Sequence, residues 1–234
     1  MNVLSCFDGM SCGQIALDRS GYKIDNYFAS EIKKHAIDLV CKRFPKTIHL
    51  GDIKKIDYYN GCFSVQGNLG SWLEVPGKFN IQLILAGSPC KGISKLNQKQ
   101  EGLKHKESIL FWEFIRLLRS IQKYNPEVYF LLENTPGQKE AIYAITKELG
   151  VRPIKLNSSL VSAQNRKRLY WTNIPITNIP KNKRLTTKDI LEDYMSEDLL
   201  ISEGRLKWLK SDSGKKSVAK GYTKINPYPK SGCL

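Results

Sequence analysis

Short apolar runs that end abruptly in turn residues constrain the fold of this chain more than any other feature. The clearest covers residues 81–86 and leads into Gly87-Ser88-Pro89-Cys90. Such a run is typical of a buried parallel strand, and in open α/β sheets chemistry gathers at the carboxyl ends of these strands. The pattern therefore predicts that the Cys90 thiol emerges where a catalytic group would lie. Taken alone, a free Cys is more often a small buried hydrophobic residue than a nucleophile.

Strand-like runs alternate with helix-like segments along the first two thirds of the chain. The runs occupy residues 2–7, 22–30, 47–50, 79–86 and 127–132. Between them, residues 107–124 carry apolar side chains at spacings of three and four, and residues 138–149 form a second helical pattern that stops at Gly150. This alternation predicts an α/β fold with a mostly parallel sheet and helices on both faces.

The length and charge of the chain indicate its organisation and its partners. At 234 residues, one α/β domain with a small appendage is expected. The formal net charge of +15 favours a polyanionic partner, although scattered surface lysines would give the same value. Residues 181–234 hold twelve Lys or Arg against seven Asp or Glu, a net of +5. We expect a domain over residues 1–171 and a small basic region, either a DNA contact or a solvated surface, over residues 172–234.

Cysteine and histidine spacing argues against a disulfide scaffold or a metal site. The six cysteines contain no paired Cys-x-x-Cys spacing, and the three histidines form no His-Glu-x-x-His pattern. We expect reduced thiols and no metal. The sequence has no signal-type start and no apolar run of the roughly 18 residues that cross a bilayer, which predicts a cytoplasmic protein without membrane contact.

Two further segments place reactive side chains beside predicted strands. Glu133-Asn134 follows the apolar run at residues 127–132, and Gln164-Asn165-Arg166-Lys167-Arg168 precedes an aromatic strand at residues 169–171. Arg166 and Arg168 are two positions apart on an extended segment, so they should point to the same side. A packing role requires neither the carboxylate nor the arginine pair in these positions, although a salt bridge or a basic surface strand would also explain them.

Together these motifs resemble those of the cytosine-carbon-5 DNA methyltransferases. Pro89-Cys90 is similar to the nucleophile motif of that family, Glu133-Asn134 to its Glu-Asn motif, and the Gln164 segment to its Gln-x-Arg-x-Arg motif, in the same order. The resemblance implies a Rossmann-like fold that depends on S-adenosylmethionine. It also implies methyl transfer to carbon 5 of cytosine in double-stranded DNA. Lys91 departs from the family, which usually has Gln or Asn after Pro-Cys.

The first strand and turn predict a nucleoside site. The turn contains glycines and Glu31 ends the next strand, where an acid usually binds the hydroxyls of a ribose. The glycine spacing does not complete a dinucleotide fingerprint. By resemblance the ligand is S-adenosylmethionine, with Phe7 against the adenine ring and Asp52 and Ile53 contacting the adenine. The resemblance also assigns to this cofactor site Asp8, Gly9, Gly13, Pro89 and Leu110.

The resemblance further implies a covalent mechanism. Adding the Cys90 thiolate at carbon 6 breaks the aromaticity of cytosine, and basic neighbours would favour the thiolate. Glu133 would hydrogen-bond the base, while Arg166 and Arg168 would reach its oxygen or its phosphate. The target must first be flipped out of the stack. The residues expected to contact DNA are Lys91, Ser94, Lys95 and Gln164.

The resemblance covers about residues 1–171, whereas family members continue into a further motif and a final helix beside the first strand. Three alternatives would explain this difference. The chain is one half of a split enzyme that needs a second polypeptide, a truncated form that self-associates through an exposed apolar edge, or a catalytically silent DNA-binding homologue. An RNA cytosine methyltransferase is disfavoured because its Cys-Phe-Thr tripeptide does not occur. The recognised sequence and the setting, whether restriction-modification, viral genome protection or an epigenetic mark, stay open.

Overall fold

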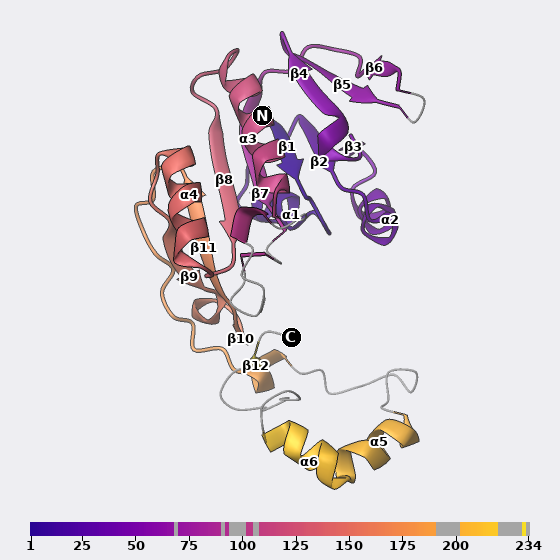
Figure 1. The fold of residues 1–234 in the computed structure, drawn as a ribbon, viewed down its shortest axis with the longest axis vertical. Helices are drawn as coiled ribbons and strands as arrows, with labels where there is room; N and C mark the ends of the chain where they lie inside the picture. The colour runs from indigo at the N-terminus through magenta and orange to yellow at the C-terminus, as the bar shows by residue number, and fades with distance from the viewer. Residues whose placement is uncertain are drawn as a thin grey trace. The chain divides into compact units, whose positions relative to one another are not determined.

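The structure is a computed structural model that describes residues 1–67, 70–89, 92–93, 102–104, 108–190, 202–219 and 231–232. Seven strands form a main sheet in the order β3-β2-β1-β7-β8-β11-β9 (Figure 1). Their bounds are β1 Asn2–Cys6, β2 Asn26–Ser30, β3 Ile48–His49, β7 Ile81–Gly87, β8 Tyr129–Asn134, β9 Ile154–Asn157 and β11 Lys167–Thr172.

The centre of this sheet is parallel. β1 pairs in parallel with β2 and β7, β2 with β3, and β7 with β8, whereas β11 runs antiparallel to β8. Each of the five predicted strand segments overlaps one of these parallel strands, so the prediction of a mainly parallel α/β sheet is confirmed. The antiparallel β11 corresponds to the aromatic strand expected near residues 169–171.

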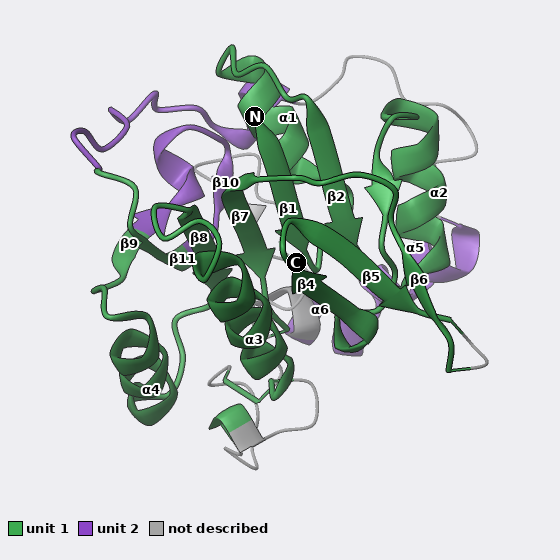
Figure 2. Ribbon diagram, turned by 90° about the horizontal axis from the view of Figure 1, so that it is seen from above, with its two compact units in different colours: residues 1–155, 168–175 green, residues 156–167, 176–234 purple. Residues whose placement is uncertain are grey.

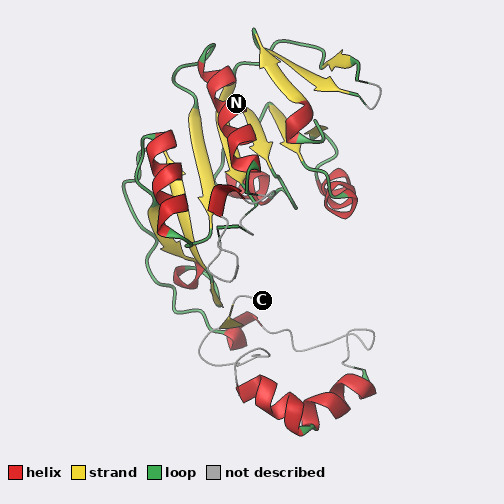
Figure 3. Cartoon of the chain, viewed as in Figure 1, coloured by secondary structure: helices red, strands yellow, loops and turns green. Residues whose placement is uncertain are grey.

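One face of the sheet carries the larger core. The helices α3, Leu110–Gln122, and α4, Lys139–Leu149, lie over this face (Figure 3). Phe111, Phe114 and Leu117 of α3 are completely buried, and the same cluster includes Leu4, Ile84 and Leu132 of the sheet. The apolar periodicity of residues 107–124 thus becomes the face that α3 presents to the sheet.

The opposite face carries a much smaller cluster. It consists of Val3, Tyr27, Ala29 and Leu83, with partly buried neighbours that include Leu17 of α1, Cys12–Arg19. Alternation along the strands produces the two clusters, since successive side chains point to opposite faces. Helices therefore cover both faces, as predicted. A further helix, α2, Lys34–Arg43, buries Ala36 and Val40.

A small antiparallel sheet was not predicted from the sequence. After the short 3-10 helix η1, Ile53–Lys55, the strands β4, Ile56–Tyr59, β5, Cys62–Gln66, and β6, Trp72–Glu74, pair in the order β4-β5-β6. Tyr58 and Phe63 stand opposite each other and are buried in the larger core. The alternation of buried and exposed residues in β4 is typical of a strand with one wet face.

The chain divides into two compact units, drawn in different colours in Figure 2. The first unit comprises Met1–Lys155 and Arg168–Pro175, and the second comprises Leu156–Lys167 and Ile176–Leu234. This division differs from the boundary expected between residues 171 and 172. Residues up to Pro175 remain with the sheet because β11 pairs with β8 and because the Asn173 side chain bonds the Phe130 amide and the Val128 carbonyl at 2.8 and 2.9 Å.

The second unit contains short elements. β10, Gln164–Asn165, pairs in parallel with β12, Ser231–Gly232. The helices are α5, Glu203–Lys210, and α6, Asp212–Ala219, with 3-10 turns η3, Ser158–Leu160, and η4, Thr187–Ile190. Ser211 joins α5 to α6, and its hydroxyl donates to the Trp208 carbonyl at 2.6 Å. In the first unit, Gly102–Lys104 forms the 3-10 turn η2.

Candidate active site

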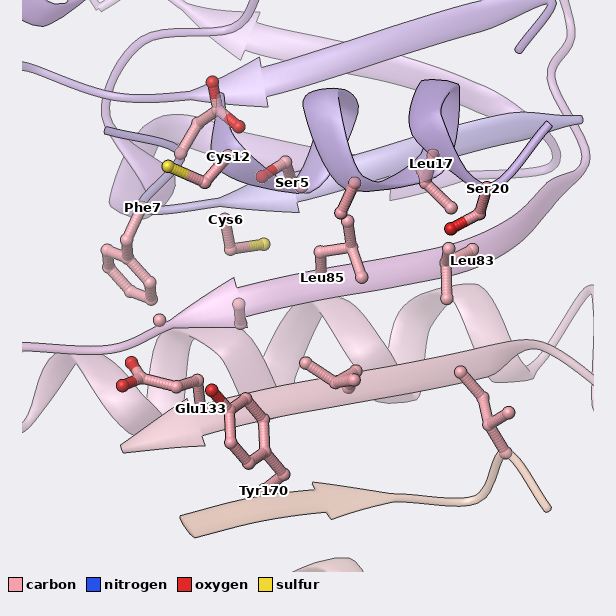
Figure 4. Close-up of a pocket in the computed structure, with 17 residues that line it drawn as sticks. Ser5, Cys6, Phe7, Cys12, Leu17, Ser20, Leu83, Leu85, Glu133 and Tyr170 are labelled. Atoms are coloured by element: carbon pink, nitrogen blue, oxygen red, sulfur yellow. The ribbon is translucent and has the colours of Figure 1, made fainter. Parts of the chain in front are cut away.

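The carboxyl ends of the central parallel strands bring distant residues to one edge of the main sheet. Phe7 follows β1, Glu31 follows β2, Ser88 follows β7, and Glu133 is the second-last residue of β8. The register pairs Gly87 with Glu133, so the ends of β7 and β8 are level. Figure 4 shows Phe7 and Glu133 at this end of the strands. This is the edge at which open α/β sheets bind ligands.

A narrow pocket at this edge joins five of the residues that were predicted to bind the cofactor. Its lining is Phe7, Ser30, Glu31, Ile32, Asp52, Ile53 and Leu110. The five predicted members come from the ends of β1 and β2, from η1 with the residue before it, and from the first residue of α3. The structure thus groups the aromatic ring and the two carboxylates proposed for one nucleoside.

Glu31 is held in place by backbone amides. One carboxylate oxygen accepts a hydrogen bond from the Gly9 amide at 2.9 Å, and the other accepts from the amides of Ile32 and Lys33, each at 2.9 Å. The Asp8 amide donates to the Ser30 carbonyl at 3.0 Å. These bonds fasten the turn after β1 to the end of β2, so Phe7 and Glu31, the proposed adenine and ribose contacts of these two strands, are held close together.

The turn between β1 and α1 requires left-handed backbone at three positions. Phe7 has φ of 60°, Gly9 of 59° and Ser11 of 57°. Glycine adopts this region freely, but a bulky side chain such as that of Phe7 rarely does, and such outliers concentrate at functional sites. Phe7 lines both the narrow pocket and the groove described next. The strained conformation therefore sets an aromatic ring between two cavities.

A larger groove opens on the α1 side of the sheet. Its volume is about 540 Å³, and Figure 4 shows it between α1 and the strands β7 and β8. Leu83, Leu85 and Leu131 supply apolar walls, while Asp8 and Glu133 line it as well. Gly13 also lines it, and a Cβ there would lie 2.5 Å from Leu85 Cδ1, so glycine permits the close packing of α1 on β7.

Asp8 accepts two side-chain hydrogen bonds within the first unit. The Ser11 hydroxyl donates to it at 2.5 Å and the Tyr27 hydroxyl at 2.9 Å. Burial, followed by the negative charge of Asp8, raises the pKa of Tyr27 above its ordinary value, so Tyr27 stays a hydrogen-bond donor. Sequence reasoning did not identify Tyr27, because nothing in its local pattern distinguishes it from a core residue of β2.

Glu133 forms an ion pair across the antiparallel strand. Arg168 Nε lies 2.6 Å from Glu133 Oε1, and the two side chains are 17% and 29% exposed. Two of the residues predicted for catalysis are therefore brought together. The contact also agrees with the alternative interpretation, in which Glu133 only forms a salt bridge. A salt bridge and a hydrogen bond to the base are compatible, because a carboxylate can accept several hydrogen bonds.

Cys90, Lys91, Ser94 and Lys95 lie outside the described residues, but the residues flanking Cys90 are anchored. The Asn134 amide group donates to the Ser88 hydroxyl at 2.9 Å. On the other side, the Gly92 amide donates to the Ser108 hydroxyl and the Gln138 side chain donates to the Gly92 carbonyl, both at 3.0 Å. Pro89, next to Cys90, is half-buried. The end of β8 thus holds Ser88 on one side of the predicted nucleophile, and residues that precede α3 and α4 hold Gly92 on the other side.

The predicted Gln-x-Arg-x-Arg cluster spans the division between the units. Gln164 and Arg166 belong to the second unit, where the Ser158 hydroxyl donates to the Gln164 carbonyl at 2.7 Å and the Arg166 amide donates to Asn157 Oδ1 at 3.0 Å. Arg168 belongs to the first unit. Gln164, Arg166 and Arg168 are half-buried while the residues between them are exposed, which fits the alternation of an extended segment.

The described part of the chain contains neither a cluster of metal ligands nor a membrane-spanning helix. Among these residues, no three His, Cys, Asp or Glu side chains are grouped closely enough to hold a metal ion. No helix within the same ranges has the length and apolar character to cross a bilayer.

The α/β fold of the chain is similar to that of two methyltransferases of known structure. Its structure is similar to the methyltransferase EhMeth of Entamoeba histolytica, with a TM-score of 0.62 and 16% identity over 86% of this chain and 63% of that one. It is also similar to a DNMT2 mutant of Spodoptera frugiperda, with a TM-score of 0.59 and 19% identity over 100% of this chain and 69% of that one. At these identities the likeness concerns the fold.

The chain belongs to the C-5 cytosine-specific DNA methylase family, whose model matches residues 1–230. Two relatives are the orphan methyltransferases M.Rho11sI of Bacillus phage rho11s and M.SPRI of Bacillus phage SPR, which are 25% and 26% identical over 88% and 82% of this chain. The chain spans 36% and 42% of their lengths. A putative type II methyltransferase of Methanocaldococcus jannaschii is 30% identical over 49% of this chain and 34% of its own length. The family resemblance is confirmed, and S-adenosylmethionine is the cofactor that this family implies.

Proposed function

We propose that this chain transfers a methyl group from S-adenosylmethionine to carbon 5 of cytosine in double-stranded DNA. The observation that carries the proposal is the single sheet edge that holds the Phe7 pocket, the Glu133–Arg168 pair and the anchored residues on both sides of Cys90. A nucleoside site, a base-contacting carboxylate and a nucleophile are the three parts that this reaction requires. Membership of the C-5 cytosine-specific DNA methylase family supports methyl transfer as the class of reaction.

The residues of the narrow pocket fit the adenosine part of the cofactor. Glu31 follows β2 and can accept from ribose hydroxyls, while the Phe7 ring offers an apolar surface to adenine. The turn after β1 bears Asp8, and Glu31 at the end of β2 accepts a hydrogen bond from its Gly9 amide. Two carboxylates at this place suit a cofactor with a sulfonium and no phosphate. The pocket measures only about 40 Å³, so we expect the half-buried Phe7 or Leu110 side chain to move outward when adenine enters. When bound, S-adenosylmethionine supplies an electrophilic methyl group.

The remaining chemistry is assigned to residues of the chain. The Cys90 thiolate adds to carbon 6 of the flipped base, and the electron pair of the 5,6 double bond moves toward carbon 5 and the ring nitrogen. Glu133 hydrogen-bonds that nitrogen and the exocyclic amine, and Arg168 holds the Glu133 carboxylate in position. After methylation, loss of the carbon 5 proton and of the Cys90 thiolate restores the aromatic ring.

The second unit is proposed to contact the DNA backbone. Its helices α5 and α6 carry exposed basic side chains, with the Arg205 guanidinium 4.4 Å from the centre of the Trp208 ring. Arg166 and Gln164 are proposed to reach the target nucleotide, and Lys91, Ser94 and Lys95 the surrounding strand. Basic residues that neutralise phosphates make affinity fall with salt, so replacing Lys207 and Lys210 by Ala should flatten that dependence.

Transfer of a labelled methyl group to unmethylated duplex DNA tests the proposal. We expect label in DNA with the unsubstituted chain, none with Cys90→Ser, and unchanged label with Cys41→Ser, which removes an exposed thiol on α2. Label that persists with Cys90→Ser would refute the nucleophile. DNA binding without any label would identify a silent homologue or one half of a split enzyme, and label in RNA alone would refute the DNA substrate.

Trapping the chain on DNA that contains 5-fluorocytosine would also report the recognised sequence. The fluorine blocks loss of the substituent at carbon 5, so the Cys90 adduct should persist and its flanking bases can be sequenced. A relative named as a putative type II methyltransferase supports a restriction-modification setting, and relatives named as orphan methyltransferases support an enzyme without a nuclease partner. Adducts at one short motif would support both settings, whereas adducts without a motif would contradict them.

A further inference from the structure

Arg116 connects α3 to the turn that forms one wall of the narrow pocket. Its terminal nitrogen Nη2 donates to the carbonyls of Ile53 and Ile56 at 3.0 and 2.7 Å. Nη1 donates to Asp57 Oδ1 at 2.6 Å, and Nε donates to Glu113 Oε2 at 2.9 Å. The first three bonds join positions about sixty residues apart in the sequence, and the side chain is 35% exposed.

The geometry of these bonds calls for a guanidinium. Two backbone carbonyls and a carboxylate that stand on different sides of one group match the fixed fork of donors that arginine presents. Hydrogen bonds from a charged donor are stronger than neutral ones. A lysine could keep the ion pair with Asp57 but could not reach both carbonyls with the same fixed geometry. The network therefore fixes the peptide groups at both ends of η1 relative to α3.

The atoms that Arg116 fixes belong to the pocket. Ile53 is the first residue of η1 and lines the pocket with Asp52, whose carboxylate accepts from the Lys54 amide at 3.1 Å. Leu110, which also lines the pocket, is the first residue of α3, the helix that carries Arg116. Arg116 thus links two parts of the pocket lining that are far apart in the sequence.

We propose that Arg116 is a positioning residue that holds Asp52 and Ile53 in the conformation that recognises the adenine of the cofactor, an inference that rests on the function proposed above. Arg116 itself does not line the narrow pocket. It acts through the η1 turn, so its loss should weaken recognition of the base more than it weakens the fold.

Calorimetric titration with S-adenosylhomocysteine, the product form of the cofactor, tests this inference. We expect Arg116→Lys to bind about tenfold more weakly than the unsubstituted chain, because the paired carbonyl bonds are lost. The matched control is Arg119→Ala on the same helix. Arg119 donates to the Glu148 carbonyl of α4 at 2.8 Å, away from the pocket, so the affinity of that variant should stay within about twofold.

A second ligand separates positioning from general stability. The unsubstituted chain should prefer S-adenosylhomocysteine over its deaminated inosine analogue by about tenfold, because the 6-amino group is lost, and Arg116→Lys should reduce that preference toward one. DNA affinity should not change. Equal preference in both proteins, or equal weakening by Arg119→Ala, would overturn the role of Arg116. Failure of the unsubstituted chain to bind S-adenosylhomocysteine would instead overturn the proposed cofactor, and the inference with it.

Discussion

The two faces of the main sheet in the first unit are packed to different depths. On the side of α3 and α4, one large cluster joins buried side chains of the main sheet, the small sheet and both helices, including Phe111, Phe114 and Trp171. On the side of α1, the buried cluster has four residues, and α1 itself has no fully buried residue. The same strands supply both faces, because their side chains alternate.

This difference gives the two sides of the sheet different roles: the α3 side stabilises the fold, and the α1 side leaves a groove open to solvent. The α3 side anchors the strand ends through close packing, which keeps Glu133 and the residues around Cys90 at fixed positions. The α1 side leaves apolar strand residues such as Leu85 and Leu131 at a groove that Phe7 and Glu133 also line. The narrow pocket proposed for the cofactor is lined by Leu110 of α3, whereas the larger groove lies on the less deeply packed α1 side.

The largest expected effect comes from two neighbouring leucines of β8. Leu132 is completely buried on the α3 side, whereas Leu131 is half-buried and lines the groove. Leu132→Ala should lower the free energy of unfolding by about 3 kcal/mol because it leaves a closed cavity. Leu131→Ala should cost about 1 kcal/mol, since it removes less apolar burial. Urea unfolding of both variants measures the difference.

Equal losses for the two leucines would contradict the comparison. They would show that the groove face is covered in solution, and sedimentation would then reveal whether a second copy of the chain covers it. A monomer with unequal losses would support an open groove.

A pair of glycines gives the next effect. A Cβ on Gly137 would lie 2.1 Å from the backbone carbonyl oxygen of Ile93, which belongs to the larger core. A Cβ on Gly13 would instead meet the tip of Leu85, which can swing into the groove. Gly137→Ala should therefore cost about 2 kcal/mol of unfolding free energy and Gly13→Ala clearly less. Thermal melts of the two variants check this, and the opposite order would show that the Leu85 side chain cannot move.

Alkaline pH should destabilise the fold through one buried ionisable side chain in each cluster, the Cys6 thiol on the α3 side of the sheet and the Tyr27 hydroxyl on the α1 side. Burial, and then the charge of Asp8, raises the pKa of Cys6 from 9.0 to about 12, and the pKa of Tyr27 is raised above 10.0 for the same reasons. The unfolded chain therefore loses these protons first as the pH rises. Each group should remove about 1.4 kcal/mol per pH unit, starting near pH 9 for Cys6 and near pH 10 for Tyr27.

Urea unfolding between pH 8 and pH 11 tests this order. Cys6→Ala should flatten the loss that begins near pH 9, and Tyr27→Phe should flatten only the loss that begins near pH 10. A profile that Cys6→Ala leaves unchanged would show that this thiol is accessible in the folded chain.

The sequence predicted those parts of the fold that depend on local pattern. Continuous apolar runs identified β1, β7 and β8, and the spacing in residues 107–124 identified α3. The small sheet from β4 to β6 was not predicted, because its strands are short and mix polar residues such as Asp57 and Ser64 with apolar ones. Its place depends on Tyr58 and Phe63 packing into a core formed by other segments.

In the candidate site, too, local pattern predicted some features, and contacts between distant residues determined the rest. Parallel strands bring their carboxyl ends together, so Phe7, Glu31 and Glu133 could be placed at one edge from strand order alone. The anchoring contacts could not be predicted, because Ser108 and Gln138 bond residues 16 and 46 positions away and have no distinctive local pattern. Side chains that position a site through distant backbone groups leave little trace in a single sequence.

The smallest expected effect concerns Ser11, where α1 begins on the open side. Ser11 has φ of 57° and ψ of 40°, and its hydroxyl donates to Asp8 at 2.5 Å. Ser11→Gly and Ser11→Ala both remove this hydrogen bond, but only glycine adopts left-handed backbone without strain. Ser11→Gly should therefore be more stable than Ser11→Ala by about 1 kcal/mol in urea unfolding. Equal stability would mean that the turn relaxes when the bond to Asp8 is lost, and the rigidity assigned to the cofactor turn would then have to come from Glu31 and its three amide donors alone.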